Sequence, residues 1–401
     1  MNISSDKLGQ PLPLLGGLSP ARFMREYWQR KPLLIRQAIP GFRPALSIAD
    51  IRELVRRDEV ESRLIWQDGQ GWHMKQGPFA RLPAMKRPNW TVLAQSVDLH
   101  DDRMAELLHR FRFIADARLD DAMISVASDG GGVGPHFDSY DVFLLQAHGK
   151  RVWRISQQRD LSLQPGLPLK ILRNFQEEET YVLEPGDMLY LPPHVAHDGI
   201  AQGDCMTISI GFRTATRAML ARGLLEAAAD QIIARAGEPG SLYGHPPLPG
   251  ARLEGHYEDR GEGATATPAR IPERLIASAL EAVNKVRFDE ALAARFLGQW
   301  LTDPPEAAWF DPANEPLDPA EQWPLPGRLV LDRCTRMMYA GKELFINGEV
   351  APLPAGPLMR RLADERSLDC NTPQLKRLSF DARLVLGDWL ERGWLHYVEG
   401  A

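Results

Sequence analysis

The chain has 401 residues, 44% of them hydrophobic and 25% charged, which is typical of a globular protein with more than one domain. Its formal net charge of -6 argues against general nucleic-acid binding and suits a basic protein partner. No apolar run reaches the roughly 18 residues of a membrane helix, and the first residues lack the apolar core of a signal peptide. The three cysteines, Cys205, Cys334 and Cys370, are widely spaced and predict reduced thiols in a cytoplasmic protein.

The N-terminal part of the chain predicts small helices and short strands. Helices are expected over residues 20–30, 47–57 and 101–110, and strands over 33–35 and within 90–99. Lys31-Pro32 ends the first helix because proline has no backbone N–H to donate. Ser47 is suited to cap the second helix, since its hydroxyl can accept from a free backbone N–H.

Between residues 121 and 213, short strand-like runs are separated by Gly, Pro and polar turns. These runs cover residues 122–126, 142–145, 151–155, 180–183, 187–191 and 206–212. Short strands at this spacing are typical of a β-sandwich or a jelly-roll barrel. We therefore predict an α+β protein built on a double-stranded β-helix, also called a cupin barrel.

After residue 213 the hydrophobic period becomes helical. Helices are predicted over 214–236 and 272–301, with a Gly- and Pro-rich connector at 237–268 and a linker at 303–326. The apolar faces of these two helices suit a homodimer.

Residues 327–401 predict a compact unit of small helices and strands. A hairpin is expected to turn at Asn347-Gly348, followed by helices over 357–364, 372–378 and 381–392 and a strand over 394–398. This pattern favours a winged-helix-like module. The predicted domains are therefore a barrel with N-terminal helices (1–213), a helical region (214–302), and a linker with the winged-helix-like module (303–401).

The most informative stretch is a glycine-rich segment that ends in His136-Phe137-Asp138. Alternate residues of a strand share a face, so His136 and Asp138 can present an imidazole and a carboxylate to one point. Further histidines lie in residues 191–199, at a separation that a barrel can close. Two imidazoles and one carboxylate leave open positions on Fe(II) for substrate and oxygen, as in non-haem Fe(II) oxygenases. The plain alternative, a pair of surface polar residues, is disfavoured by the flanking glycines and strands.

Two histidines, His194 and His197, compete for the third position. Because they are three residues apart, they point to opposite faces of one strand and cannot both be ligands. His194 follows two prolines and suits the rim of the barrel, whereas His197 precedes Asp198, a candidate hydrogen-bond partner. These arguments give His197 only a modest preference.

Iron centres of this kind often use 2-oxoglutarate, whose distal carboxylate needs a cation such as the planar fork of arginine. Lys150, Arg151 and Arg154 all follow His136 on one predicted strand. Arg151 shares a face with the apolar Trp153, so we expect Arg151 to point inward and the other two outward. The polar residues expected near the same mouth are Ser125, Tyr140 and Gln146.

The residues around this motif resemble one known family. Residues 130–146, followed by Arg151-Val-Trp153-Arg154, are similar to the bacterial ribosomal oxygenases of the JmjC class, which are arginine hydroxylases of a large-subunit ribosomal protein. Further matches lie in residues 27–36, 191–199 and 209–213. The likeness covers most of the first 215 residues and continues more weakly through a layout with a helical dimerisation region and a winged-helix domain.

The resemblance implies that His136, Asp138 and His197 bind Fe(II), and so it selects His197 over His194. It also implies that Arg151 holds 2-oxoglutarate, that Ser125 lies in the co-substrate or substrate pocket, and that the protein is a homodimer. The implied reaction is hydroxylation of an arginine Cβ. Related members hydroxylate histidine, and demethylation by the same iron chemistry is a third option, which the metal motif does not separate. Asp120, Asp121 and Asp129 are candidates to receive a guanidinium.

The rival hypothesis is a regulator that senses a small ligand in the barrel and binds DNA through its winged helix. Residues 327–401 carry 11 Lys and Arg against 10 Asp and Glu, a net charge of +1. Binding to DNA phosphates needs a clear basic face. A packing or protein-contact role therefore fits this module better, and direct nucleic-acid binding is not expected.

Overall fold

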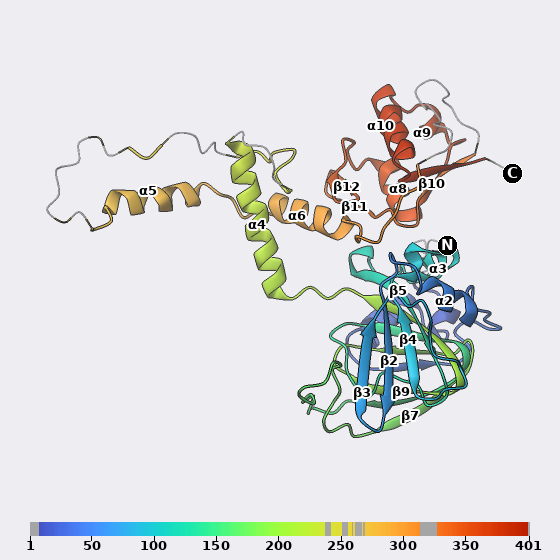
Figure 1. Ribbon diagram of the computed structural model, residues 1–401. Coiled ribbons are helices and arrows are strands. Elements are labelled where there is room, and N and C mark those ends of the chain that lie inside the picture. The colour runs from blue at the N-terminus through green and yellow to red at the C-terminus, as the bar shows by residue number, and fades with distance from the viewer. Residues whose placement is uncertain are drawn as a thin grey trace. The chain divides into compact units, whose positions relative to one another are not determined.

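The computed structural model describes residues 8–236, 242–250, 256–258, 260, 267, 269–312 and 327–399. The chain forms two compact units, one of residues 1–214 with 307–309 and one of residues 215–306 with 310–401 (Figure 1). Each unit has its own buried apolar core. Within the described ranges, no helix is both long enough and apolar enough to cross a membrane.

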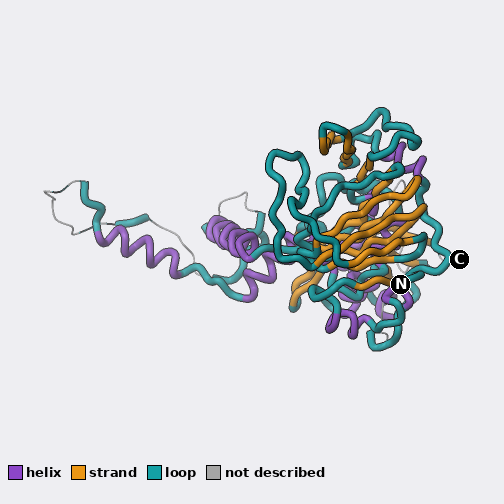
Figure 2. The backbone as a smooth tube through the Cα atoms, turned by 90° about the horizontal axis from the view of Figure 1, so that it is seen from below, coloured by secondary structure: helices purple, strands orange, loops and turns teal. Residues whose placement is uncertain are grey.

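The first unit is organised around one large antiparallel sheet, whose strands lie side by side in Figure 2. Its strands are β1 (Leu33–Ile35), β2 (Ser62–Asp68), β3 (Gly71–Gln76), β4 (Trp90–Ala94), β5 (Leu119–Ala127), β6 (Val142–Ser156), β7 (Glu179–Leu183), β8 (Met188–Leu191) and β9 (Ala196–Phe212). The order is β1-β8-β6-β9-β5-β4-β2-β3, with β7 paired to β6. This long-range antiparallel pairing is the topology expected of the predicted double-stranded β-helix.

The helices of this unit begin where the sequence predicts. They are α1 (Pro20–Glu26), α2 (Ile48–Leu54) and α3 (Asp102–His109), with 3-10 turns at Pro13–Leu15, Val97–Leu99 and Asp116–Arg118. Ser47 caps α2 as predicted, because its Oγ accepts from the Asp50 N–H at 3.2 Å while the Ser47 N–H donates to the Asp50 carboxylate at 2.7 Å. The fold differs from the prediction by adding the β2–β3 hairpin, which we did not expect.

Strand β6 contains two runs that the sequence analysis predicts as separate strands. Runs 142–145 and 151–155 are parts of one strand, and β-bulges around His148 interrupt its pairing with β9. Gly149 lies in the left-handed region with φ of 65°, and the carbonyl oxygen of Asp204 occupies the place where a Cβ would be. A glycine is therefore required at this bulge.

The bulges change which residues face the interior of the barrel. Leu144 and Trp153 belong to the same buried cluster, although one position is even-numbered and the other odd-numbered. Phe143 and Leu145 belong instead to the core on the other side of the sheet. We call the side that carries Leu144 and Trp153 the inner face, and β9 continues it through His197, which pairs with Ile155.

The second unit combines helices with two small sheets. Its helices are α4 (Arg217–Arg235), α5 (Glu273–Asn284), α6 (Glu290–Thr302), α8 (Pro357–Glu365), α9 (Pro373–Lys376) and α10 (Phe380–Glu391). Its strands are β10 (Arg328–Leu331), β11 (Met337–Ala340), β12 (Glu343–Ile346), β13 (Glu349–Val350), β14 (Ser367–Asp369) and β15 (Leu395–Val398). The sheet orders are β14-β10-β15 and β11-β12-β13.

Several predictions for this part of the chain can be compared with the structure. The hairpin turns at Asn347-Gly348 as predicted, with φ values of 46° and 82°. The prediction of one helix over 272–301 is wrong, because α5 ends at Asn284 and a separate helix, α6, follows it. Asp289 caps α6, since its side chain accepts from the Leu292 N–H. Most of the predicted connector at 237–268, and residues 313–326 of the predicted linker, lie outside the described residues.

Helix α6 is tied to the strands of the winged-helix-like module. The ring of Phe345 on β12 occupies the place of a Cβ at Gly298. The Thr302 hydroxyl accepts from the Gly348 N–H at 3.1 Å, and Arg295 pairs with Glu343. These contacts place α6 and the module in the same compact unit.

Candidate metal centre

The glycine-rich segment threads between strands too closely for side chains. A Cβ at Gly132 would lie 2.6 Å from the carbonyl oxygen of Gly199, and the carbonyl oxygen of Trp90 occupies the same place at Gly131. The chain then pairs with the start of β9 through two backbone hydrogen bonds between His136 and His197, of 2.9 and 2.8 Å. This pairing sets the two imidazoles side by side.

Three predicted ligands meet at one point. The candidate ligand atoms of His136, Asp138 and His197 all lie within 4.8 Å of one another. The two imidazole rings are 4.2 Å apart between centroids, and Nε2 of His197 lies 3.6 Å from a carboxylate oxygen of Asp138. This is the donor set of a facial iron triad, with two nitrogens and one carboxylate oxygen.

Backbone carbonyls orient both imidazoles. Nδ1 of His136 lies 2.8 Å from the Gly134 carbonyl oxygen, and Nδ1 of His197 lies 2.9 Å from the Val195 carbonyl oxygen. Because a carbonyl oxygen only accepts, each Nδ1 carries the proton and each Nε2 keeps a free lone pair. Burial and the neighbouring His136 lower the pKa of His197 to about 4, so His197 is neutral at physiological pH, as a ligand must be.

The second histidine of the competing pair lies outside this cluster. His194 is exposed in a turn with φ of 68°, and its backbone N–H donates to the Asp138 carbonyl oxygen at 2.8 Å. This is the rim position expected for it. The expectation that Asp198 bonds to His197 is wrong, because Asp198 pairs with Arg154 and the Val195 carbonyl takes that place.

Arg151 is a buried cation on the inner face. Its side chain is 3% exposed, and its Nη1 donates to the Gly199 carbonyl oxygen at 3.2 Å. Its Nε and Nη2 have no hydrogen-bond partner among the described residues, and neither does the buried indole N–H of Trp153. Buried donors without acceptors are costly, and a bound carboxylate would satisfy them. Lys150 and Arg154 point outward as predicted, to Glu184 and to Asp198.

The other predicted polar residues separate into interior and rim. Ser125 is 7% exposed, and its Oγ lies 3.4 Å from the Thr207 carbonyl oxygen, while the Thr207 hydroxyl donates to the side-chain oxygen of Gln146 at 3.0 Å. These residues form a polar patch on the inner face. Tyr140 is 38% exposed and lies at the rim.

The three candidate acids for a guanidinium already have partners. Asp120 pairs with Arg213 at 3.2 Å. Asp121 accepts from the Ser96 N–H at 2.9 Å, and Asp129 accepts from the Gly203 N–H at 2.8 Å. The carboxylate of Asp129 lies on an exposed residue next to the glycine-rich segment.

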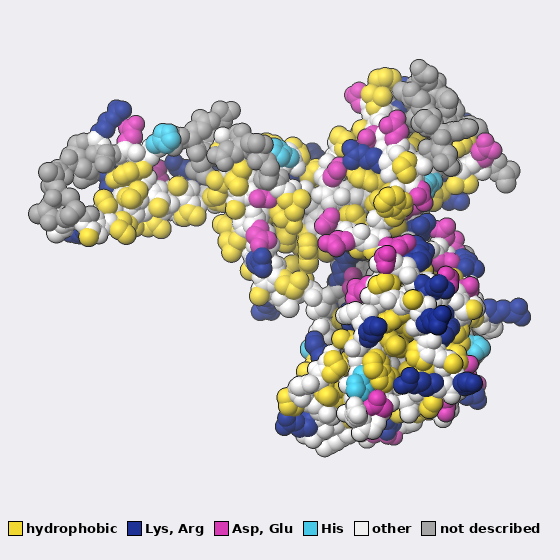
Figure 3. Space-filling view, in the orientation of Figure 1, with side chains coloured by type: hydrophobic (Ala, Val, Ile, Leu, Met, Phe, Trp, Pro, Cys, Tyr) yellow, Lys and Arg dark blue, Asp and Glu magenta, His cyan; other side chains and the backbone are white. Residues whose placement is uncertain are grey.

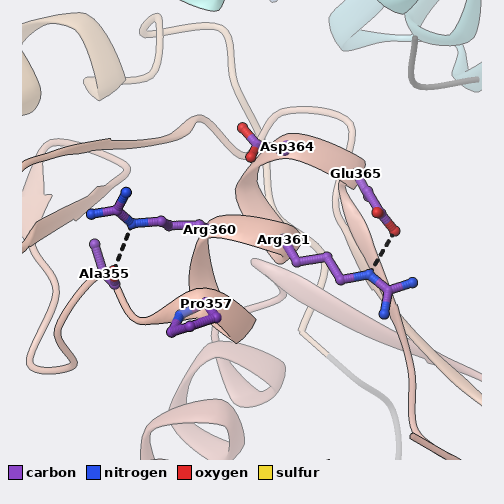
Figure 4. Close-up of a pocket in the computed structure, with 6 residues that line it drawn as sticks. All are labelled: Ala355, Pro357, Arg360, Arg361, Asp364 and Glu365. Carbon is purple, nitrogen blue, oxygen red and sulfur yellow. Dashed lines mark hydrogen bonds and ion pairs between the residues drawn. The ribbon is translucent and has the colours of Figure 1, made fainter. Parts of the chain in front are cut away.

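A pocket on the second unit carries no comparable chemistry. It is lined by Ala355, Pro357, Arg360, Arg361, Asp364 and Glu365 (Figure 4). Arg360 donates to the Ala355 carbonyl oxygen at 2.8 Å and covers the ring of Tyr339, while Arg361 pairs with Glu365 at 3.0 Å. Both guanidinium groups are thus occupied by the protein itself.

Comparison with known proteins agrees with the predicted barrel and winged helix. A family model described as a JmjC domain matches residues 106–220, and one described as a ROXA-like winged helix matches residues 285–396. The structure resembles that of YcfD, a ribosomal oxygenase from Escherichia coli, in complex with cobalt and 2-oxoglutarate. The TM-score is 0.73 at 26% identity, over 95% of this chain and 98% of that one.

Two curated relatives carry related names. The chain is 36% identical to a probable ribosomal oxygenase of Haemophilus influenzae. The 203 aligned residues cover 49% of this chain and 50% of that protein. The chain is 31% identical to the ribosomal protein uL16 3-hydroxylase of Escherichia coli K12. The 353 aligned residues cover 86% of this chain and 89% of that protein. A likeness of this extent shows that the chain belongs to the bacterial JmjC-type ribosomal oxygenase family.

Proposed function

We propose that this protein is an Fe(II)- and 2-oxoglutarate-dependent hydroxylase of a protein side chain. One observation carries the proposal: the facial cluster of His136, Asp138 and His197 shares its barrel with Arg151, a buried cation with free donors. The three ligands would hold Fe(II), and Arg151 would hold the distal carboxylate of 2-oxoglutarate. Ser125 would line the same pocket. The relative's structure with cobalt and 2-oxoglutarate supports this pairing of groups.

The proposed reaction uses oxygen and 2-oxoglutarate as co-substrates. One oxygen atom enters succinate as 2-oxoglutarate loses CO2, and the other replaces a C–H bond of the substrate with C–OH. The iron supplies the oxygen activation when bound. The backbone carbonyls of this chain orient the two imidazoles, and Arg151 would anchor the keto-acid. Apolar side chains such as Trp153 and Leu189 pack in the buried cluster on the same inner face and would help to exclude water.

We infer that the substrate is a basic ribosomal protein of the large subunit, hydroxylated at the Cβ of an arginine. The name of the relative, ribosomal protein uL16 3-hydroxylase, supports both the substrate class and the position of the hydroxyl. The net charge of -6 favours a basic partner. A ribosomal substrate would also place the enzyme in the cytoplasm.

Mass spectrometry of the relevant ribosomal protein tests the proposal. Incubation with enzyme, Fe(II) and 2-oxoglutarate is expected to add about 16 Da, the mass of one oxygen atom, to one arginine. His136→Ala and Asp138→Ala should abolish the product, whereas His194→Ala is the matched control and should retain it. A modified histidine, or loss of a methyl group as formaldehyde, would move the assignment to the histidyl hydroxylases or demethylases. If no succinate forms under any condition, the oxygenase assignment fails.

We also propose that residues 214–302, which lie in sequence between the barrel domain (1–213) and the winged-helix-like domain (303–401), form the contact surface of a homodimer. Helix α5 buries no residue within the described chain. Its exposed apolar residues are Leu275, Ile276, Leu280 and Val283, and hydrophobic side chains gather along it in Figure 3. Light scattering should give the mass of a dimer, and Leu280→Glu should reduce it to that of a monomer.

A further inference from the structure

Two apolar side chains from distant parts of the chain contact one glycine of the metal-ligand segment. Gly134 has a φ of 79°, in the left-handed region. A Cβ at Gly134 would lie 2.6 Å from Cδ1 of Ile171 and 2.8 Å from Cζ2 of Trp72. Trp72 lies on β3, and Ile171 lies in the segment between β6 and β7. The backbone of Gly134 is therefore fixed by side-chain packing as well as by its own conformation.

Gly134 is also the residue that orients His136. Its carbonyl oxygen accepts the Nδ1 proton of His136 at 2.8 Å, which keeps Nε2 free. On the next residue, the carbonyl oxygen of Pro135 accepts from the Leu172 N–H at 2.8 Å. The same segment thus contacts Gly134 through the side chain of Ile171 and Pro135 through the backbone of Leu172.

The segment that supplies Ile171 is itself braced. Ile171 and Leu172 are each 1% exposed. The backbone N–H of Gln164 donates to the Ile171 carbonyl oxygen at 2.8 Å, and its side-chain amide donates to the Leu172 carbonyl oxygen at 3.1 Å. A bridge between Leu163 and Leu172 adds a further backbone link. Ile171 is therefore a fixed wall against Gly134.

The carbonyls that orient the two imidazoles are held in different ways. The carbonyl of Val195, which orients His197, belongs to the turn that leads directly into β9, where His197 pairs with Ile155. His136 lies outside the named strands, and among the described residues its backbone is joined to the sheet by its bridge to His197 alone. The aim of His136 consequently depends on packing from other parts of the chain.

We propose that Trp72 and Ile171 are positioning residues for the metal centre. By packing on Gly134 they hold the carbonyl that fixes the proton on Nδ1 of His136, and so they aim Nε2 at the metal position. They act through Gly134 and His136 and are not themselves proposed as metal ligands. The inference rests on the proposed metal role of His136, Asp138 and His197.

Cobalt binding to the full-length protein tests the inference without any turnover. Metal-free protein is titrated with Co(II), its visible absorption gives the dissociation constant, and the unfolding temperature of the metal-free form is measured alongside. Trp72→Ala and Ile171→Ala should each raise the dissociation constant for Co(II) by about 10-fold or more, the usual effect of losing the groups that orient a ligand. Trp72→Phe and Ile171→Leu should recover most of the affinity, since they refill the space beside Gly134.

Each alanine variant has a matched control in the same hairpin or segment. Trp66 lies on β2 of the same hairpin and on the opposite face from Trp72, where it stacks on His73 at 5.0 Å. Leu172→Ala removes an apolar side chain of the same size as Ile171→Ala does. It leaves in place the backbone N–H of residue 172, which donates to the Pro135 carbonyl oxygen. Trp66→Ala and Leu172→Ala should lower the unfolding temperature and leave the affinity for Co(II) within about 2-fold.

Two results would overturn the positioning role. One is an unchanged Co(II) affinity in both Trp72→Ala and Ile171→Ala. The other is an equal loss of affinity in the two controls, because general loosening of the barrel would then account for the effect. The proposed metal centre fails as well if the wild-type protein does not bind Co(II), or if His136→Ala binds Co(II) as tightly as the wild type does. That outcome is recognisable because it appears before any positioning variant is made.

Discussion

At the scale of single residues, the chemistry depends on a buried cation with free donors. Arg151 is 3% exposed, and two of its three guanidinium nitrogens lack partners among the described residues. Arg151→Lys keeps the charge but removes the planar fork, so the dissociation constant for 2-oxoglutarate should rise about 10-fold, or ~1.4 kcal/mol. Calorimetry on Co(II)-loaded protein measures this. Arg154→Lys, which changes an outward residue of the same strand, should bind as the wild type does, and equal weakening would contradict the role of Arg151.

The buried carboxyl of Asp121 makes the stability of the folded protein depend on pH. Burial raises the pKa of its carboxyl from 3.8 to about 6, against the lowering effect of the Ser96 N–H, and Asp120 raises it further. Since the folded form binds this proton more tightly than the unfolded chain, its contribution to stability is present below about pH 4 and is lost as pH rises through 6.

Asp121→Asn should therefore stabilise the protein at neutral pH. Removing the buried charge is expected to raise the free energy of unfolding by about 1–2 kcal/mol at pH 7.5, after allowing for partial exposure of the side chain. At pH 4 the variant and the wild type should unfold at the same temperature. Thermal unfolding at the two pH values checks this, and an equal shift at both would show that the charge is not the cause.

At the scale of elements, sequence patterns predict the strands but not how they join. Alternation predicts runs 142–145 and 151–155, yet the bulge at His148 that makes them one strand depends on the backbone of Asp204, which is distant in sequence. The β2–β3 hairpin was not predicted because its residues are half-buried on both faces, so they show no clear alternation. His136 and Asp138 could be placed together because His-x-Asp is a local pattern, but the third member of the cluster, His197, was selected over His194 only by the family resemblance. The backbone carbonyls that orient the imidazoles leave no signal in the side chains.

Close packing between β6 and β9 gives a test at this scale. A Cβ at Gly199 would lie 2.6–2.9 Å from three ring carbons of Trp153. Gly199→Ala should therefore displace the indole and cost about 1–3 kcal/mol of stability. Gly69→Ala is the control, because nothing lies within 4 Å of a Cβ at that position. Chemical denaturation of both variants measures the difference, and equal stabilities would show that the ring can move freely.

At the scale of the whole molecule, contacts of α6 bear on where the winged-helix-like domain begins. The predicted boundary at residue 303 leaves α6 outside it, whereas the matching family model starts at residue 285. The structure ties α6 to that module by the contact between Gly298 and the ring of Phe345 and by the bond from the Gly348 N–H to Thr302. Helix α6 also packs on α4, where the ring of Phe296 occupies the place of a Cβ at Gly223.

These contacts predict how fragments of the chain behave. A fragment of residues 215–399 should unfold in one cooperative transition, because it keeps both partners of α6. A fragment of residues 303–399 lacks α6, so the ring of Phe345, which is fully buried in the intact chain, loses its contact with Gly298. This fragment should lose roughly 2–5 kcal/mol of stability. Calorimetry of the two fragments measures this difference. If the shorter fragment unfolds at the same temperature as the longer one, α6 adds nothing to the module, and the boundary predicted at residue 303 is the physical one.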